Sequence, residues 1–146
     1  MKKEIWVHFK SRNVYEDGND DFMEFKTEGT FFEKDGKYFL KYEEKNEYDK
    51  VTVTIKTEDK KVTILRFGEI NTQMTIEKGR KHIKNYETPQ GLFEISINAT
   101  SVDVDIKENK GSIKLCYDVE LNGVKSSSNT IEIEFNWVII NLYKEA

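Results

Sequence analysis

The chain has few of the residues that form cross-links or metal centres. It has a single cysteine, Cys116, which excludes an internal disulfide. This cysteine and two histidines, His8 and His82, are too few soft ligands for a closed zinc site. We therefore expect no metal and no other cofactor.

Long apolar runs and an excess of positive charge are also absent. No apolar stretch approaches the length that a membrane span needs, and the start MKKE is not followed by the apolar segment of a secretory signal. A net charge of −4 and a pI near 5.4 argue against a protein that binds nucleic-acid backbones. These absences predict a cytoplasmic protein with no membrane or nucleic-acid partner.

Proline and glycine are scarce as well. Pro89 is the only proline, and the eight glycines form no linker or low-complexity tract. Charged residues make up 34% of the chain and alternate with apolar ones, which argues against disorder. With no internal boundary visible, residues 1–146 are predicted to form one domain.

What the sequence does have is alternation, clearest in a long hairpin over residues 91–121. Phe93, Ile95 and Ile97 share one face, but after Ala99 the apolar residues move to even positions, beginning at Val102. A slip of one residue turns the wrong face inward unless a bulge absorbs it, so we expect a bulge between Ala99 and Val102. A straight strand over residues 92–106 would span roughly 50 Å, so it must also bend.

The rest of the chain reads as further strands, with no convincing helix. The expected segments are residues 5–9, 23–31, 38–42, 51–55, 61–67, 72–77, 81–87 and 130–143, besides the two arms of the hairpin. Gly29 within a strand predicts a kink or close packing. Both faces of residues 61–67 are apolar, so periodicity leaves its inner face open. Bent strands and short connections predict an all-β fold, a closed or nearly closed antiparallel up-and-down barrel of about 8–10 strands.

With the strands placed, the chain resembles the YwiB-like family of small uncharacterised bacterial β-barrel proteins. The resemblance rests on GTFF at 29–32, YFLKYEE at 38–44, VTILRFG at 62–68, Met74, Gly79, YETPQG at 86–91 and GSIKLCYD at 111–118, in this order and spacing. It covers nearly the whole chain and implies a lipocalin-like, or calycin-like, barrel. It implies no activity and no catalytic residues.

Arg66 is the first candidate for a binding residue, because it lies in a strand among apolar neighbours. An arginine in a partly dry cavity can bind a carboxylate or phosphate, and hydroxyl or imidazole groups on other strands can assist it. The candidates for this role are Tyr42, Tyr86, Tyr117 and His82. The alternatives are an ion pair of Arg66 with Glu43 or Glu44 that closes a barrel end, or an arginine simply exposed on the outer face.

Other chemical motifs are weaker. Cys116 with His82 or His8 is the only thiol–imidazole pair available, and an ordinary thiol is favoured. The basic cluster at 79–84 reads as a solvated strand end. The acidic loop at 17–21 departs from the calcium-loop pattern, since Phe22 occupies the glycine position.

Two functions follow from this reading. The first is non-catalytic binding of a small, partly apolar or anionic ligand inside the barrel. The second is a structural or protein-interaction barrel that uses exposed apolar residues such as Val138 and Ile140, and the sequence is compatible with a homo-oligomer. An enzyme is the third and least supported reading.

Overall fold

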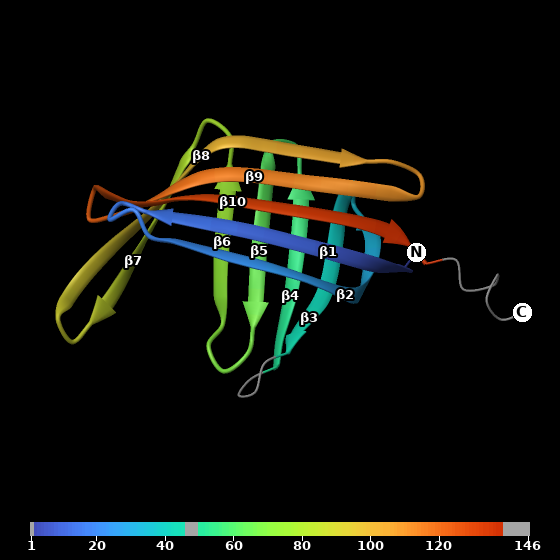
Figure 1. Cartoon of the computed structure of the whole chain (residues 1–146), viewed down its shortest axis with the longest axis horizontal. Coiled ribbons are helices and arrows are strands. Elements are labelled where there is room, and N and C mark those ends of the chain that lie inside the picture. Colours follow the sequence, from blue (N-terminus) through green and yellow to red (C-terminus); the bar gives the residue numbers. More distant parts are fainter. Residues whose placement is uncertain (1, 46–49, 139–146) are drawn as a thin grey trace, which may run out of the picture.

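The computed structural model describes residues 2–45 and 50–138 and places most of them in β-strands (Figure 1). The ten strands are β1 (Lys2–Tyr15), β2 (Asp20–Lys34), β3 (Lys37–Lys45), β4 (Lys50–Glu58), β5 (Lys61–Phe67), β6 (Thr72–Glu77), β7 (Lys81–Thr88), β8 (Gly91–Ile106), β9 (Lys110–Leu121) and β10 (Val124–Trp137). The described part of the chain contains no helix of the length and apolarity needed to cross a membrane. The expected all-β fold is confirmed.

All ten strands belong to one antiparallel sheet in the order β6-β5-β4-β3-β2-β1-β10-β9-β8-β7. Consecutive strands are therefore neighbours in the sheet, except β6 and β7. The first and last strands, β1 and β10, also pair with each other. The β1–β10 register runs from Ile5↔Trp137 to Tyr15↔Ser127. This pairing rolls the sheet into a barrel and leaves β6 and β7 as its two ends.

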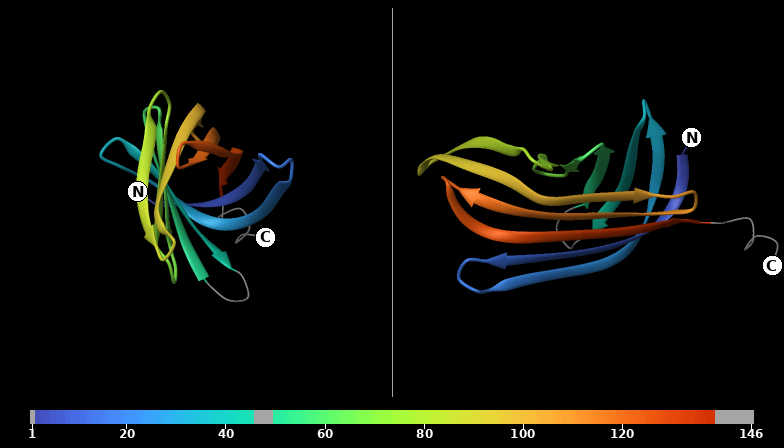
Figure 2. Two further views of the ribbon diagram at one scale, coloured as in Figure 1. Left: turned by 90° about the vertical axis from the view of Figure 1, so that its left-hand side faces the viewer. Right: turned by 90° about the horizontal axis from the view of Figure 1, so that it is seen from above.

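The rolled sheet has two layers whose strands cross steeply. In Figure 1, β8, β9, β10, β1 and β2 run horizontally in front of β3 to β6, and Figure 2 shows the two layers from the side. The chain turns the corner between layers in β2, where pairing with β3 begins at Gly29↔Tyr42. A Cβ atom at Gly29 would lie 2.6 Å from the Lys41 carbonyl oxygen. Only glycine fits this approach, so the close packing expected at Gly29 is confirmed.

The expected bulge in the long hairpin is also present. The β8–β9 register shifts between Ala99 and Ser101, so Thr100 has no partner across the ladder. Its hydroxyl instead donates to the carbonyl oxygen of Cys116 at 3.1 Å. The extra residue restores the inward direction of Val102 after the parity change, which lets a strand of 16 residues follow the curved wall.

Side chains from both layers fill the middle of the barrel. The fully buried members come from opposite walls, for example Ile5 and Ile133 in front and Leu40 and Ile55 behind. Phe31 and Phe135 stack with ring centroids 5.4 Å apart. Val62 is 0% exposed, which settles that Val62, Ile64 and Arg66 form the inner face of β5.

The barrel is nearly closed, because β6 and β7 do not form a ladder. Their backbones are linked by an isolated bridge, Glu77↔Arg80, just before β7 begins, beside a second bridge between Lys78 and Ala99 of β8. Side chains cover the remaining gap. Lys84 Nζ donates to the Gln73 carbonyl oxygen at 2.7 Å, and His82 Nε2 lies 2.9 Å from Glu77 Oε1.

The last strand begins earlier than expected. Asn122 and Gly123 have φ angles of 50° and 80° and form a two-residue turn, so the serines at 126–128 lie within β10 rather than in a loop. Val138 follows the strand and donates its N–H to the Glu4 carbonyl oxygen at 2.9 Å. The expected continuation to residue 143, with Ile140, lies outside the described residues.

Candidate ligand site at the mouth of the barrel

A cleft of about 1060 Å³ opens where β2 loses its partner on one side. Residues 20–28 of β2 pair only with β1, because the ladder with β3 starts at Gly29. The cleft lies between this free edge and the end of β3 and start of β4, where Glu44 and Thr52 line it. Its inner wall includes Met23 and Phe25 from β2 and Tyr42 and Glu44 from β3. We call it the mouth cleft.

The floor of the mouth cleft is aromatic. The Phe25 ring lies between Phe9 and Tyr42, with centroid distances of 4.9 and 5.9 Å. Tyr42 is only 3% exposed, and burial, with the nearby Glu44 carboxylate, raises the pKa of its hydroxyl well above the usual value. The phenol therefore stays neutral at physiological pH and can act as a hydrogen-bond donor.

Arg66 is held by a carboxylate of its own chain. Its two terminal nitrogens donate to Glu44, Nη1 to Oε1 at 3.0 Å and Nη2 to Oε2 at 2.5 Å. This hydrogen bonding raises the already high pKa of the guanidinium, so Arg66 stays charged. The arrangement is the ion pair at a barrel end that the sequence offered as an alternative to ligand binding. Arg66 fixes the direction of Glu44, which lines the cleft.

The structure brings two of the five candidate residues together. Tyr42 and Arg66 flank the buried Val53 in one row across β3, β4 and β5, on the inner face. Tyr117 belongs to the other layer, and burial raises its pKa to about 12. His82 and Tyr86 lie on β7, where His82 contacts Glu77 and Tyr86 is 44% exposed. None of these last three residues lines the mouth cleft.

Met23 and Phe25 were not recognised as site residues from the sequence. Both belong to the strand predicted over residues 23–31, and their alternation gives no sign that half of this strand lacks a second partner. The signal that could have found them is Gly29, since a strand that changes layers at a glycine leaves its preceding half with one unpaired edge.

The weaker motifs of the sequence are engaged in local contacts. Cys116 Sγ lies 3.9 Å from the Thr130 hydroxyl, while His8 and His82 contact glutamates, so the described residues contain no thiol–imidazole pair. Asp17 accepts from the backbone N–H of Asn19 at 2.9 Å, as in an ordinary turn. The described residues contain no cluster of three metal-ligating side chains.

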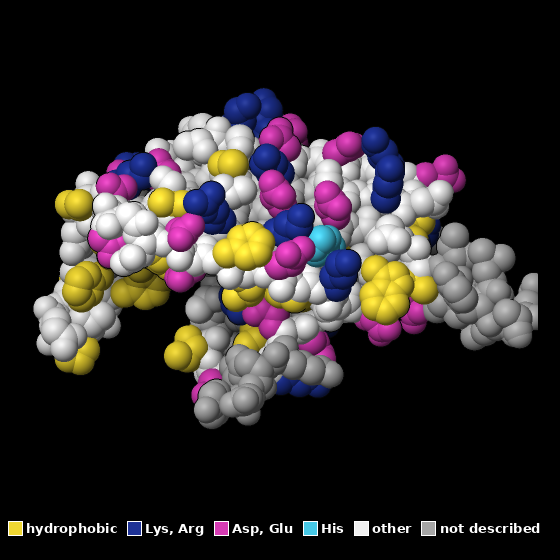
Figure 3. Space-filling model, viewed as in Figure 1, with side chains coloured by type: hydrophobic (Ala, Val, Ile, Leu, Met, Phe, Trp, Pro, Cys, Tyr) yellow, Lys and Arg dark blue, Asp and Glu magenta, His cyan; other side chains and the backbone are white. Residues whose placement is uncertain are grey.

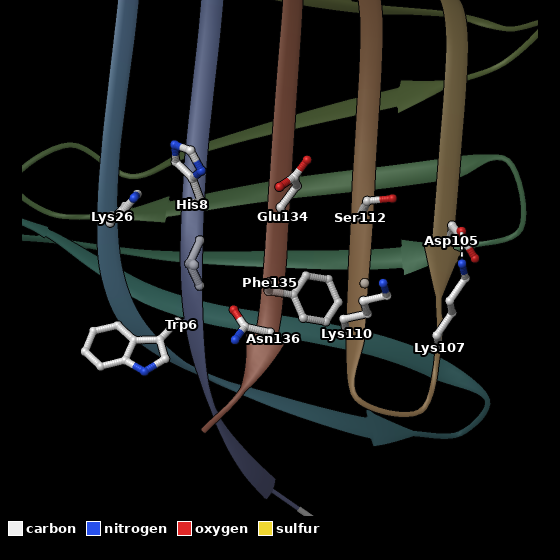
Figure 4. A pocket seen from close by; sticks show the side chains of 12 residues that line it. Trp6, His8, Lys26, Asp105, Lys107, Lys110, Ser112, Glu134, Phe135 and Asn136 are labelled. Atoms are coloured by element: carbon white, nitrogen blue, oxygen red, sulfur yellow. Dashed lines mark ion pairs between the residues drawn. The ribbon is translucent and has the colours of Figure 1, made fainter. Parts of the chain in front are cut away.

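A second hollow, of about 570 Å³, lies on the outer face of the front layer (Figure 4). Side chains from five neighbouring positions line it: Trp6, His8, Ser112, Glu134 and Asn136, with lysines at its ends. His8 Nε2 lies 2.5 Å from Glu24 Oε2, so its ring is held against the sheet. Charges of both signs surround this hollow. Trp6 is exposed there, whereas Phe135 and Val7, which also line it, are buried in the core, so the hollow offers little apolar surface to a ligand.

Comparison with known proteins agrees with the fold. The chain is 28% identical over 137 residues to the "Uncharacterized beta-barrel protein YwiB" of Bacillus subtilis (strain 168), covering 92% of this chain and 96% of that protein. The crystal structure of the ywiB protein from Bacillus subtilis superposes with a TM-score of 0.79 at 27% identity, over 94% of this chain and 93% of that one. The family described as "Domain of unknown function (DUF1934)" matches residues 7–133. The resemblance seen in the sequence is thereby confirmed, and the chain belongs to the DUF1934 family.

Proposed function

We propose that the protein binds a small, partly apolar ligand without catalysis, in the mouth cleft. The observation that supports this most is the cleft itself, because its aromatic floor of Phe25 and Tyr42 is reached past the partly exposed Met23. Its volume of about 1060 Å³ suits a molecule of drug or lipid-fragment size. The packed middle of the barrel leaves the ligand at the mouth rather than in a central lumen.

The polar groups of the cleft suggest the rest of the ligand. The neutral Tyr42 hydroxyl and the Glu44 carboxylate lie beside the apolar floor, so a hydrogen-bonding group would face them. Lys2, Lys26 and Lys41 also line the cleft, but an anionic group beside the aromatic floor would face the Glu44 carboxylate, and Arg66 already forms two hydrogen bonds with Glu44. The proposed ligand is therefore an uncharged molecule with one apolar and one polar end.

The test uses N-phenyl-1-naphthylamine, an uncharged apolar probe whose fluorescence rises on binding. We expect saturable binding by the wild-type protein. Met23→Glu places a charge in the inner wall of the cleft and should weaken binding by about tenfold or more, because a bound apolar ligand would cover an unpaired carboxylate, which is costly.

Phe22→Glu is the matched control. Phe22 is the adjacent residue of the same strand, is 65% exposed against 52% for Met23, and points to the opposite face. It should leave probe binding unchanged. Equal loss in both variants, or no saturable binding by the wild type, would remove the proposal. Native mass spectrometry of the undenatured protein would then show whether a natural ligand accompanies it.

A further inference from the structure

The hollow of Figure 4, which we call the outer hollow, has an exposed tryptophan at one end. Trp6 lies on β1 between the buried Ile5 and Val7, so its side chain points away from the core. It is 46% exposed, and Figure 4 shows its ring nearly face-on, with one face of the indole turned to solvent. An open indole face is a surface on which a flat ring can stack.

Two rows of outward side chains lead from this end across the front layer. Asn136 and Lys110 continue the row of Trp6 on β10 and β9. In the adjacent row, Glu134 and Ser112 are cross-strand partners. Neighbouring strands lie about 4.8 Å apart, so the row from Trp6 to Lys110 is about 10 Å long. The outer hollow therefore runs across the strands, and its volume of about 570 Å³ admits a short chain of rings.

The charged groups of the outer hollow are available to a ligand. Among the residues that the structure describes, no ion pair involves Lys26, Lys110 or Glu134. Glu132, the preceding outward residue of β10, is by contrast paired with Lys114 at 3.4 Å. Figure 3 shows this face of the molecule, where basic and acidic side chains are interspersed. The outer hollow thus offers hydrogen-bond donors and acceptors of both charges next to an aromatic surface.

This mixture of charges selects a neutral ligand with many hydroxyl groups. A hydroxyl can donate one hydrogen bond and accept two, so neighbouring hydroxyls can donate to the Glu134 carboxylate and accept from the Lys110 ammonium. A phosphate or carboxylate ligand could also accept from Lys110, but Glu134 would repel it. Sugar rings combine such hydroxyls with apolar C–H faces, which can pack on the indole of Trp6.

We propose that the outer hollow binds a linear, neutral oligosaccharide. One pyranose ring would stack on Trp6, and hydroxyls of the following rings would face Asn136 and Glu134. The outer hollow differs in face and in ligand from the mouth cleft, whose aromatic floor of Phe25 and Tyr42 lies on the inner side of the sheet. The inference therefore goes beyond the function proposed above.

The probes are maltotetraose, cellotetraose and tetra-N-acetylchitotetraose, which are linear and neutral but differ in linkage and substituents. Saturation-transfer NMR titrations of the full-length protein should show saturable binding of at least one of them. Salt should not change this binding, because the ligand is uncharged. Trp6→Ala should weaken it by about fivefold or more through loss of the stacking surface.

Phe22→Ala is the matched control for Trp6→Ala. Phe22 is an exposed aromatic residue on the outer face of the neighbouring strand, and it does not line the outer hollow. Phe22→Ala should bind the saccharide as the wild type does, and a loss equal to that of Trp6→Ala would overturn the inference.

Glu134→Ala tests the polar part of the outer hollow and the charge of its ligand. Removal of the carboxylate should weaken saccharide binding by about fivefold or more, since hydrogen bonds to charged groups are the stronger ones. An anionic ligand would instead bind more tightly, because a repulsive charge is removed. Glu132→Ala is the control, because Glu132 lies on the same face of the same strand and pairs with Lys114. It should leave saccharide binding unchanged.

Three results would overturn the inference: no saturable binding of any of the three saccharides, equal loss in Glu132→Ala, or saturable binding of AMP that strengthens in Glu134→Ala. The last result would make the outer hollow a nucleotide site. Trp6 lines both the outer hollow and the mouth cleft, whereas Glu134 lines only the outer hollow. Glu134→Ala should therefore lose saccharide binding and still bind N-phenyl-1-naphthylamine, which distinguishes failure of this proposal from failure of the mouth-cleft proposal.

Discussion

At the scale of single residues, two glycines show how a missing side chain shapes this barrel. Gly29 lets β2 approach the Lys41 carbonyl at the corner between layers. Gly111 is the partner of Phe135, and a Cβ atom there would overlap the Phe135 ring, which fills the space beside the glycine. Neither glycine has a positive φ. Both positions therefore require glycine because a side chain would not fit, and not because of the backbone conformation.

Gly29→Ala should destabilise the protein by about 1–3 kcal/mol, because the corner must move to admit the new methyl group. Thermal unfolding measures the effect as a lower Tm. Thr30→Ala, at the adjacent position, is the control and should change the stability less. An unchanged Tm for Gly29→Ala would mean that the corner is not closely packed.

At the scale of elements, the connections are held by charge clusters as well as by turns. Glu58 closes the turn between β4 and β5 and contacts three lysines: Lys61 at 2.9 Å, Lys37 at 3.0 Å and Lys56 at 3.4 Å. Hydrogen bonds from Lys61 and then Lys37 lower the pKa of Glu58 from its ordinary 4.5 to about 2. One carboxylate thus ties the ends of three strands together.

Because the folded-state pKa of Glu58 lies below the unfolded value, its stabilisation is complete above pH 4.5 and declines as pH falls towards 2. Glu58→Gln should therefore cost about 0.5–1 kcal/mol at pH 7, a value limited by solvent screening. The difference from wild type should shrink between pH 5 and about pH 3.

Urea unfolding at several pH values measures this difference. Glu43→Gln is the control, since the Glu43–Lys50 pair at 3.4 Å is more exposed. If the difference in unfolding free energy between Glu58→Gln and wild type stays constant as pH falls, the charge-cluster explanation is contradicted.

At the scale of the whole molecule, the β1–β10 pairing makes the barrel one cooperative unit. It joins the first and last strands, and its inward residues Ile5 and Ile133 are both fully buried. Both layers share one core, which predicts that residues 1–146 unfold together as a single domain.

Ile133→Ala should lower the free energy of unfolding by about 2–4 kcal/mol, from lost burial and a new cavity. The transition should stay single. Tryptophan fluorescence reports on the front layer through Trp6 and Trp137, whereas far-UV circular dichroism reports on all strands. The two curves should coincide, and separated midpoints would indicate two unfolding units. Ile70→Ala, at a 79% exposed position, should change little.

Part of the site could be predicted from residue pattern, and part could not. Alternation placed the strands and the bulge after Ala99, and the sequence offered an ion pair of Arg66 with Glu43 or Glu44, of which the structure selects Glu44. It could not show that Tyr86, Tyr117 and His82 lie away from Arg66. The way in which the sheet rolls decides which strands meet at one end of the barrel, and alternation does not contain that information. Periodicity also could not choose the inner face of β5, since apolar residues lie on both sides of it.

The sequence by itself determined that the protein is built from antiparallel strands, because period-two alternation and short turns are local properties that allow little else. It favoured a barrel over two packed sheets, and the β1–β10 pairing then decided for the barrel. The tertiary structure alone decided where the barrel is open. The gap between β6 and β7 and the free edge of β2 both follow from strand lengths and layer crossing. These are long-range matches between distant segments, whereas alternation is a local property of the chain.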